Sequence, residues 1–433
     1  MKRLILYILF SSLTVSVFAQ STTTSFDVAG IKVILKPTVK EIVSMRMFYR
    51  GGVSNYSAAN AGIEDMALVA ATECGTKKYN KNAFKDLQDQ YGIEIGGSSV
   101  YDFGTISMNC ISKYFNQGWD LFAESIMNPT FDPRELDLVK TKMISDIKQE
   151  ESDPENYIEN EAIKNAFKDT PYAIDPAGEE ATLSKFTSAD LKTYYSSILN
   201  KNRMFLVVVG KISKEDLIKK ITASFASIPA KPYAPKTYAV PVFTTNSLLT
   251  KERSVATNYI VGLVNAPKMS SEDYVAYRLA ISVLSSNLFR EIRTKRNLSY
   301  APGATQTSGQ VPYAMVSVST TDPKASVEVM VNELKRLQEE TVSADGLQQL
   351  KGSFITNNYM KEQSSAAMAV SLGQSEIMGS WKIVEELPNK INATTAEQIR
   401  DAAKKYISGI KWNYLGDLKS ANEAMAAFNS PVD

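Results

Sequence analysis

Short apolar and alternating runs along this chain of 433 residues predict β-strands at regular intervals. Residues 31–35 and 42–49 are two such runs, and 105–111 alternates between apolar and polar positions. Residues 204–209 are apolar throughout and end at Gly210, which is typical of a strand buried on both faces.

Between these runs, apolar residues recur at a spacing of three to four, which predicts helices. Residues 62–72 and 116–127 show this spacing. A longer helix is predicted over 133–150, with Asp132 as its N-cap, and another begins at Thr187. Strands mixed with long helices favour an α+β fold with largely antiparallel sheets.

The order of predicted elements occurs twice, so the chain reads as two similar halves. The repeat is weak in identity but holds in order and spacing. Four pairs of segments carry it: 84–87 with 289–292, 105–108 with 314–318, 187–191 with 395–399, and 210–212 with 416–418.

Prolines cluster between the two halves and predict a semi-rigid, extended linker. They stand at positions 229, 232, 235 and 241. We therefore expect a first α+β half over 20–228, a linker over 229–241 and a second α+β half over 242–433. Each half is expected to be a mainly antiparallel sheet with helices packed on it.

The first 19 residues are typical of a signal peptide. Lys2 and Arg3 precede an apolar run over 4–17, and Val17-Phe18-Ala19 offers a cleavage site before Gln20. An uncleaved membrane anchor is the alternative. Because no later stretch is apolar enough to span a membrane, we expect a periplasmic or secreted protein with no membrane span after signal removal.

Composition excludes several classes of function. Lys and Arg number 48 against 47 Asp and Glu, so no charge excess suggests a nucleic-acid partner. The chain has no histidine, which removes the commonest metal ligand and general base. Cys74 and Cys110 could form a disulfide or remain as two buried thiols.

Several local segments together resemble the pitrilysin/insulinase-type zinc peptidases, the inverzincins, whose shorter members have two homologous α+β halves. The resemblance covers roughly residues 26–425. The segments that carry it are 51–53, 61–63, 74–79, 171–172 with 178–180, 186–191 and 202–210.

The sequence departs from this family at the metal site. The family carries H-x-x-E-H on a helix, where two histidines bind zinc and the glutamate is the general base. The motif can be aligned in two registers, one counted from Gly62 and one counted back from Gly75-Thr76. Both registers place apolar residues at most of the motif positions. The third zinc ligand of the family falls near Glu155 or Asn156. The two registers give Asp65, Leu68 and Val69, or Met66, Val69 and Ala70. We therefore assign no metal ligand to this chain and expect zinc only in a partner subunit.

A replacement metal site was weighed at the same helix. Glu64, Asp65, Glu73 and Cys74 lie close in sequence. The two adjacent carboxylates diverge on a helix, so we interpret this group as solvated helix-end carboxylates.

The second half keeps another feature of the family. Residues 291–300 resemble its R-x-x-x-x-x-x-Y segment, with Arg293 and Tyr300 at the matching positions. In the family these two reach substrate at the zinc site, and the resemblance implies the same role here, in trans. The alternative is a purely structural role, in which Arg293 caps the helix and Tyr300 packs as an aromatic residue of a strand. The family often has glycines before this helix, where this chain has residues 283–288. The serines and the asparagine among these residues suit a helix start.

The resemblance thus implies a non-catalytic subunit of a heteromeric zinc peptidase. It would supply half of a peptide-binding chamber, with Arg293 and Tyr300, to a homologous partner that carries H-x-x-E-H. Peptides are the expected substrates, and no catalysis is expected from the chain alone. The alternative is a metal-free peptide-binding or scaffold protein of the cell envelope, which would hold extended peptides at a sheet edge.

Overall fold

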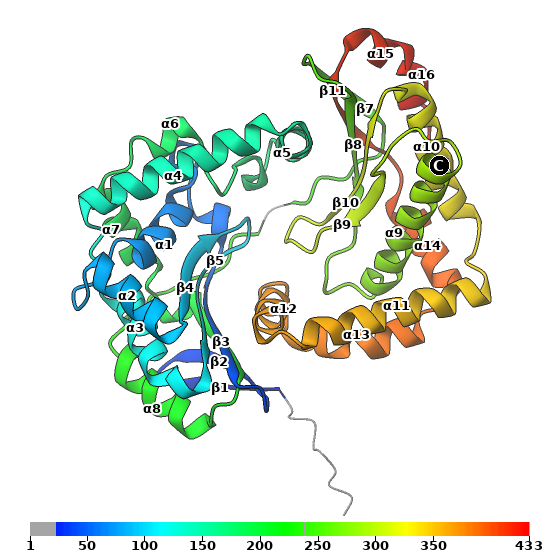
Figure 1. The fold of residues 1–433 in the computed structure, drawn as a ribbon. Helices are drawn as coiled ribbons and strands as arrows, with labels where there is room; N and C mark the ends of the chain where they lie inside the picture. Colours follow the sequence, from blue (N-terminus) through cyan, green and yellow to red (C-terminus); the bar gives the residue numbers. More distant parts are fainter. Residues whose placement is uncertain (1–22, 238, 433) are drawn as a thin grey trace, which may run out of the picture.

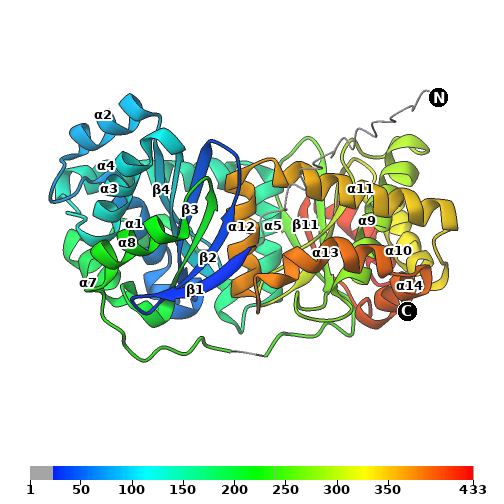
Figure 2. The same cartoon turned by 90° about the horizontal axis from the view of Figure 1, so that it is seen from below.

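The computed structural model describes residues 23–237 and 239–432. The predicted signal peptide over 1–19 lies outside these residues. Two sheet-and-helix halves stand side by side, joined by one long connection (Figures 1 and 2). Within the described residues, no helix is both long and apolar enough to cross a membrane.

Each half is built on one sheet, and the two sheets share a topology apart from one additional edge strand, β1, in the first. The first has the strand order β1-β2-β6-β3-β5-β4 and the second β7-β11-β8-β10-β9. One parallel pair occurs in each, β2 with β6 and β7 with β11, and the other pairs are antiparallel. The predicted α+β class with mainly antiparallel sheets is confirmed. The strands are β1 Thr24–Val28, β2 Ile31–Pro37, β3 Ile42–Arg50, β4 Glu94–Ser99, β5 Phe103–Ile111, β6 Met204–Gly210, β7 Ser247–Glu252, β8 Asn258–Asn265, β9 Gly303–Gln306, β10 Tyr313–Thr320 and β11 Lys411–Gly416.

Each half also has its own helices, most of which lie on the outer face of its sheet (Figure 1). In the first half they are α1 Ile63–Glu73, α2 Lys81–Tyr91, α3 Phe115–Met127, α4 Pro133–Ser152, α5 Pro154–Ala166, α6 Glu180–Leu183, α7 Ser188–Ile198 and α8 Lys214–Phe225. In the second they are α9 Tyr274–Leu288, α10 Pro323–Glu339, α11 Ala344–Glu362, α12 Ser365–Ile377, α13 Lys382–Ala393, α14 Ala396–Tyr406, α15 Leu418–Glu423 and α16 Met425–Phe428. Short helical turns are η1 Gly52–Asn55, η2 Ala58–Asn60, η3 Ser112–Tyr114, η4 Pro171–Ala173, η5 Lys201–Arg203 and the π-helix η6 Phe289–Thr294.

The predicted helix starts are confirmed by their caps. The Asp132 carboxylate accepts the backbone N–H groups of Arg134 and Glu135 at the start of α4. Thr187 and Thr395 each form a reciprocal capping box, at α7 and α14. These two caps occupy the same place in the two halves, as the sequence repeat requires.

The halves exchange one helix each. Helix α5 of the first half packs on β8 and β11, and α12 of the second half packs on β3 and β6. Under α12, Ile34, Phe48 and Phe205 are fully buried with Leu372. The inner face of each sheet is therefore covered by a helix that belongs to the other half (Figure 1). This exchange buries apolar area across the boundary and makes the two halves one packed unit.

Polar contacts reinforce this boundary. The Tyr172 hydroxyl donates to Asp102 Oδ1 at 2.5 Å, and the Gln310 N–H of the second half donates to Asp102 Oδ2 at 3.1 Å. On the other side, the buried Glu376 carboxylate of α12 pairs with Lys32 and Arg50 of the first half.

Among the described residues, the predicted linker contains no helix or strand. Lys231 is held in place because its N–H and carbonyl both bond the Asn200 side chain. Cys74 and Cys110 are buried free thiols, so of the two alternatives the structure shows the thiols. The expected boundaries of the halves stay a prediction.

Candidate functional site

The helix at the family's metal-motif position is α1, and its interior is apolar. Its N-cap Gly62 adopts φ +84°, and a Cβ there would lie 2.8 Å from the Gly178 Cα. Leu68 is fully buried, and Gly97 and Gly104 leave the space that it needs, since a Cβ on Gly97 would lie 1.9 Å from the Leu68 carbonyl oxygen. The helix therefore packs directly onto β4 and β5.

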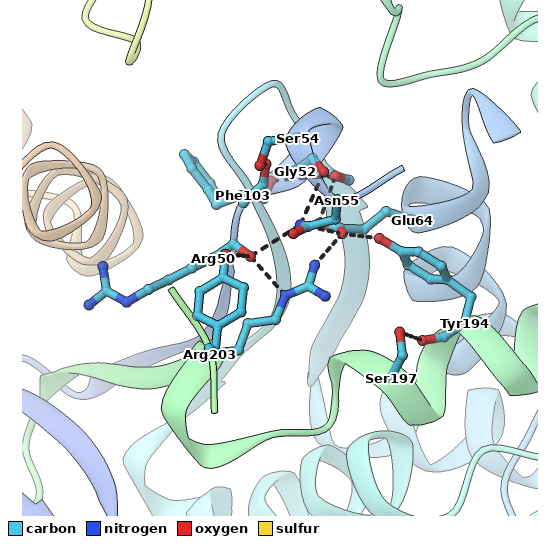
Figure 3. Close-up of polar contacts among 12 residues, drawn as sticks. Arg50, Gly52, Ser54, Asn55, Glu64, Phe103, Tyr194, Ser197 and Arg203 are labelled. Atoms are coloured by element: carbon cyan, nitrogen blue, oxygen red, sulfur yellow. Dashed lines mark hydrogen bonds and ion pairs between the residues drawn. The ribbon is translucent and has the colours of Figure 1, made fainter. Parts of the chain in front are cut away.

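Glu64, in the first turn of α1, forms a buried ion pair (Figure 3). Its carboxylate is fully buried and lies 2.6 Å from an Arg203 guanidinium nitrogen. The Tyr194 hydroxyl donates to the same oxygen at 2.5 Å, and Asn55 and Ser99 donate at 3.4 and 3.3 Å. Burial raises the pKa of Glu64, whereas the Arg203 charge and these donors oppose the rise.

Asp65, the next residue, is half-buried and bonds the same residue as Glu64 does, Ser99. The Ser99 backbone N–H donates to its Oδ1 at 2.6 Å. Burial raises the pKa of Asp65 to about 7, although the Ser99 hydrogen bond opposes the shift. The interpretation as solvated carboxylates was therefore wrong for Glu64, which is fully buried, whereas Asp65 is half-buried and bonded to the backbone.

One signal in the sequence could have revealed the ion pair. Arg203 immediately precedes the fully apolar strand β6, and an arginine is seldom buried without a carboxylate partner. The expectation of solvation failed because it considered only the spacing on α1.

An asparagine at position 65 is expected to change how stability depends on pH. The unfolded pKa of aspartate is about 3.9, and the folded pKa is about 7. Because the native state binds more protons in this window, Asp65 makes stability fall as pH rises from about 4 to about 7. The Asp65→Asn variant lacks this loss. Its free energy of unfolding, relative to that of wild type, should therefore increase from pH 5 to pH 8. Urea unfolding at both pH values measures the difference.

The exposed Asp86 of α2 supplies the control, since Asp86→Asn measures what the loss of a surface carboxylate does at the same two pH values. If Asp65→Asn gives the same difference from wild type at pH 5 and pH 8, Asp65 is not protonated in the native state.

The residues at the expected motif do not fit zinc. Leu68, Val69 and Ala70 offer no donor atoms, and Glu64 is committed to Arg203 and Tyr194. Within residues 23–237 and 239–432, no group of three or more Cys, Asp or Glu could hold a metal ion. Glu155, at the position of the third ligand, is exposed at the start of α5.

Arg293 and Tyr300 lie together in the second half. Arg293 is on η6, and its guanidinium carbon sits 4.0 Å from the Tyr300 ring centroid. The Phe289 ring lies on the same guanidinium, at 4.9 Å. Tyr300 is 77 % exposed, so it does not pack as a strand aromatic. We call Phe289, Arg293 and Tyr300 the Arg–Tyr stack.

The backbone around the stack differs from the expectation of a helix start at 283–288. These residues are the last turns of α9, which continues into the π-helix without a break. Single π-turns inside helices are frequent at functional sites. Asn297 then takes φ +52° and turns the chain back toward β9.

The neighbouring charges form a network of their own. Arg290, Lys295 and Arg296 all bond the Glu291 carboxylate, at 3.2, 2.8 and 2.7 Å. These hydrogen bonds, first from Lys295 and then from Arg296, lower the pKa of Glu291 to about 2. Arg293 stays outside this network and makes no ion pair among the described residues.

Among the described residues, no hydrogen bond or ion pair joins the side chains of the two candidate regions. The ring contacts of Arg293 are made within residues 289–300, and the Glu64 network lies in the first half. However, Ala301 lines a small pocket together with Glu155 and Glu159 of α5. The chain after Tyr300 therefore lies beside the helix where the family's third ligand was expected.

This architecture, two homologous halves with a metal-motif helix that lacks histidine, defines a protein of the peptidase M16 fold. Residues 60–179 match the family described as "Insulinase (Peptidase family M16)", and residues 185–354 match the one described as "Peptidase M16 inactive domain". The chain belongs to the M16 family of peptidases, as a member without the zinc motif.

Its relatives carry mixed descriptions. The uncharacterized zinc protease YmxG of Bacillus subtilis is 22% identical over 87% of this chain and 93% of its own. The Helicobacter pylori protein described as non-peptidase homolog YmxG is 23% identical over 59% of this chain and 60% of its own.

Solved structures show the same fold. A peptidase M16 inactive domain from Pseudomonas fluorescens has a TM-score of 0.83 at 18% identity, covering 91% of this chain and 98% of that one. The periplasmic protease PqqL of Escherichia coli has a TM-score of 0.75 at 15% identity, covering 96% of this chain but 49% of that one.

Proposed function

We propose that this chain is the non-catalytic subunit of a heteromeric zinc peptidase. It supplies half of a peptide-binding chamber and brings Arg293 and Tyr300 to the zinc site of a homologous partner that carries H-x-x-E-H. The observation that carries the proposal is the Arg–Tyr stack with its exposed Tyr300, in a chain whose own metal-motif helix offers no zinc ligands.

The stack suits contacts with a substrate. The Phe289 and Tyr300 rings both contact the Arg293 guanidinium, and its planar N–H fork can bind a peptide carbonyl. The exposed Tyr300 hydroxyl can donate to the oxyanion that forms when water attacks a peptide bond. Both groups would act on substrate held at the metal of the partner.

The match to PqqL supports a two-chain arrangement. That protease is about twice as long as the part this chain covers. A second chain of similar size would supply the other half of such a molecule here. We extend the proposal to location: the protein acts in the periplasm or outside the cell, after removal of residues 1–19.

The purified chain alone is expected to bind no stoichiometric zinc and to cleave no peptide. The reason is the absence of donor atoms at Leu68, Val69 and Ala70. Metal analysis after dialysis, with a fluorogenic peptide mixture as the activity probe, measures both. One tightly bound zinc per chain together with chelator-sensitive cleavage would contradict the proposal.

Reconstitution tests the partnership itself. The chain is mixed with a homologous H-x-x-E-H chain from the same cell, and each is measured alone and together. We expect a stable heteromer with peptidase activity well above that of the partner alone. Full activity of the partner without this chain, or no complex at micromolar concentration, would refute the subunit role.

The alternative is a metal-free peptide-binding or scaffold protein of the cell envelope. It is favoured by the open edges of β4 and β9, which pair on one side only among the described residues. Extended peptides bind such edges by strand addition. Peptide binding by the chain alone, with no effect on a partner's turnover, would support this alternative.

A further inference from the structure

The two sheets match strand for strand except at one end. Strand β2 corresponds to β7, because each runs parallel to the strand that ends at Gly210 or Gly416. In the first sheet β2 is covered by β1, which pairs with it antiparallel. Among the described residues β7 has no such neighbour and forms the edge of its sheet.

The backbone register shows which groups of β7 are free. The Ser247 N–H donates to the Ile410 carbonyl and the Arg253 N–H to the Gly416 carbonyl. Since backbone groups alternate in direction along a strand, residues 247, 249, 251 and 253 face β11. Leu248, Thr250 and Glu252 therefore turn their N–H and C=O groups to the open edge.

The exposed part of this edge spans the last four residues of β7. Ser247 and Leu248 are half-buried, and residues 249–252 are exposed. Asn246, just before the strand, donates to the carbonyls of Phe428 and Ser430, so the C-terminal segment covers the beginning. When Gly416 is aligned with Gly210, Leu249 takes the position that Ile34 has in the first sheet. Ile34 is fully buried, whereas Leu249 is 45 % exposed.

One face of the edge is apolar and basic. Leu249 and Lys251 lie on the same face because alternate strand residues do. Lys251 lies over the Tyr157 ring of α5, 4.6 Å from its centroid, and donates to its hydroxyl. Arg253 follows on this face and bonds the carbonyls of Glu151 and Ser152. A strand added here would meet a leucine and, two residues along, a cation.

We propose that the free edge of β7 binds an extended segment of another polypeptide as an added antiparallel strand, in the place that β1 fills in the first sheet. The segment carries an acidic residue opposite Lys251 and an apolar residue opposite Leu249. Because the added strand runs antiparallel, the order along it is acidic, any residue, apolar. Main-chain hydrogen bonds to Leu248, Thr250 and Glu252 hold it, and the charge selects it. The site does not depend on the peptidase role.

The test uses the full mature chain and a peptide labelled with fluorescein on its N-terminal amine, fluorescein-Thr-Glu-Thr-Val-Thr-Val-amide. Its matched control has lysine in place of glutamate. Fluorescence anisotropy is measured at a fixed, low peptide concentration while the chain is added up to about 1 mM, because short added strands bind weakly. We expect saturable binding of the acidic peptide, at least about fivefold tighter than that of the basic one.

Two pairs of variants locate the site. Thr250→Pro removes one outward N–H but none that bonds β11, so it should weaken binding about tenfold at an unchanged unfolding midpoint. Thr250→Val keeps the N–H and should bind as wild type does. Lys251→Glu should reverse the preference between the two peptides. This last variant keeps the test decisive if Thr250→Pro unfolds.

Three results would overturn the proposal. The first is no saturable binding, which would mean that Lys251 and Glu252 only protect the edge from unwanted pairing. The second is unchanged binding by a folded Thr250→Pro. The third is a Lys251→Glu chain that still prefers the acidic peptide.

Discussion

Replacing Arg203 by methionine is expected to lower the free energy of unfolding by about 3–5 kcal/mol, because it leaves the buried Glu64 carboxylate without its cation. The guanidinium also donates through Nε to the Arg50 carbonyl at 2.8 Å, and that bond is lost as well. Methionine has similar length and fits an apolar site, so lost volume contributes little. Urea unfolding at pH 7 measures the effect.

Two comparisons separate the ion pair from general damage. Lys142 of α4 pairs with Asp146 on the exposed surface, and Lys142→Met should change the free energy of unfolding by less than about 1 kcal/mol. Adding Glu64→Gln to Arg203→Met removes the uncompensated charge and should recover part of the loss. A loss below about 1 kcal/mol for Arg203→Met would show that the pair does not stabilise this region.

Acidification should also rescue Arg203→Met. Burial already raises the pKa of Glu64, and removing Arg203 takes away the largest opposing cause. The native state of this variant then binds more protons than the unfolded state above about pH 4.3, the ordinary glutamate value. Its stability relative to wild type should therefore rise as pH falls from 8 toward 5.

The sequence predicted those parts of the fold that depend on local pattern. The strands 31–35 and 42–49 correspond to β2 and β3, and the helix over 133–150 to α4. The segment 84–87 lies in α2 and its counterpart 289–292 in η6, so even weak repeat matches fell at equivalent places. Helix caps and hydrophobic periodicity determine these features, and both depend only on residues that lie within a few positions of each other in the sequence.

What the sequence did not reveal depends on tertiary contacts. Nothing in the periodicity of α5 or α12 indicates that each covers the sheet of the other half. Burial of Glu64 requires Arg203, which is 139 residues away. Arg293 and Tyr300 were selected only through the family resemblance. Their contact with each other and with Phe289 was not predicted, nor was the π-helical backbone, since residues 283–288 read equally well as a helix start.

The largest effect on activity is expected from Tyr300→Phe in a reconstituted complex. The substitution removes a hydroxyl and keeps the ring on which Arg293 stacks. If the hydroxyl donates to the oxyanion in the transition state, turnover should fall about 10²-fold or more. The fall should appear mainly in kcat, while complex formation and the zinc content of the partner stay unchanged. Steady-state kinetics with a fluorogenic peptide measures it.

Matched variants show whether the loss belongs to the stack. Tyr359 of α11 is also exposed, at 57 %, and Tyr359→Phe should leave turnover intact. Arg293→Lys keeps the charge but loses the planar fork, so it should impair peptide positioning. If both Tyr300→Phe and Arg293→Lys retain full turnover in a complex that needs this chain, the stack does not reach the substrate. The metal-free binding role would then account better for a half-buried arginine that contacts two rings and stays outside the ion pairs of its neighbours.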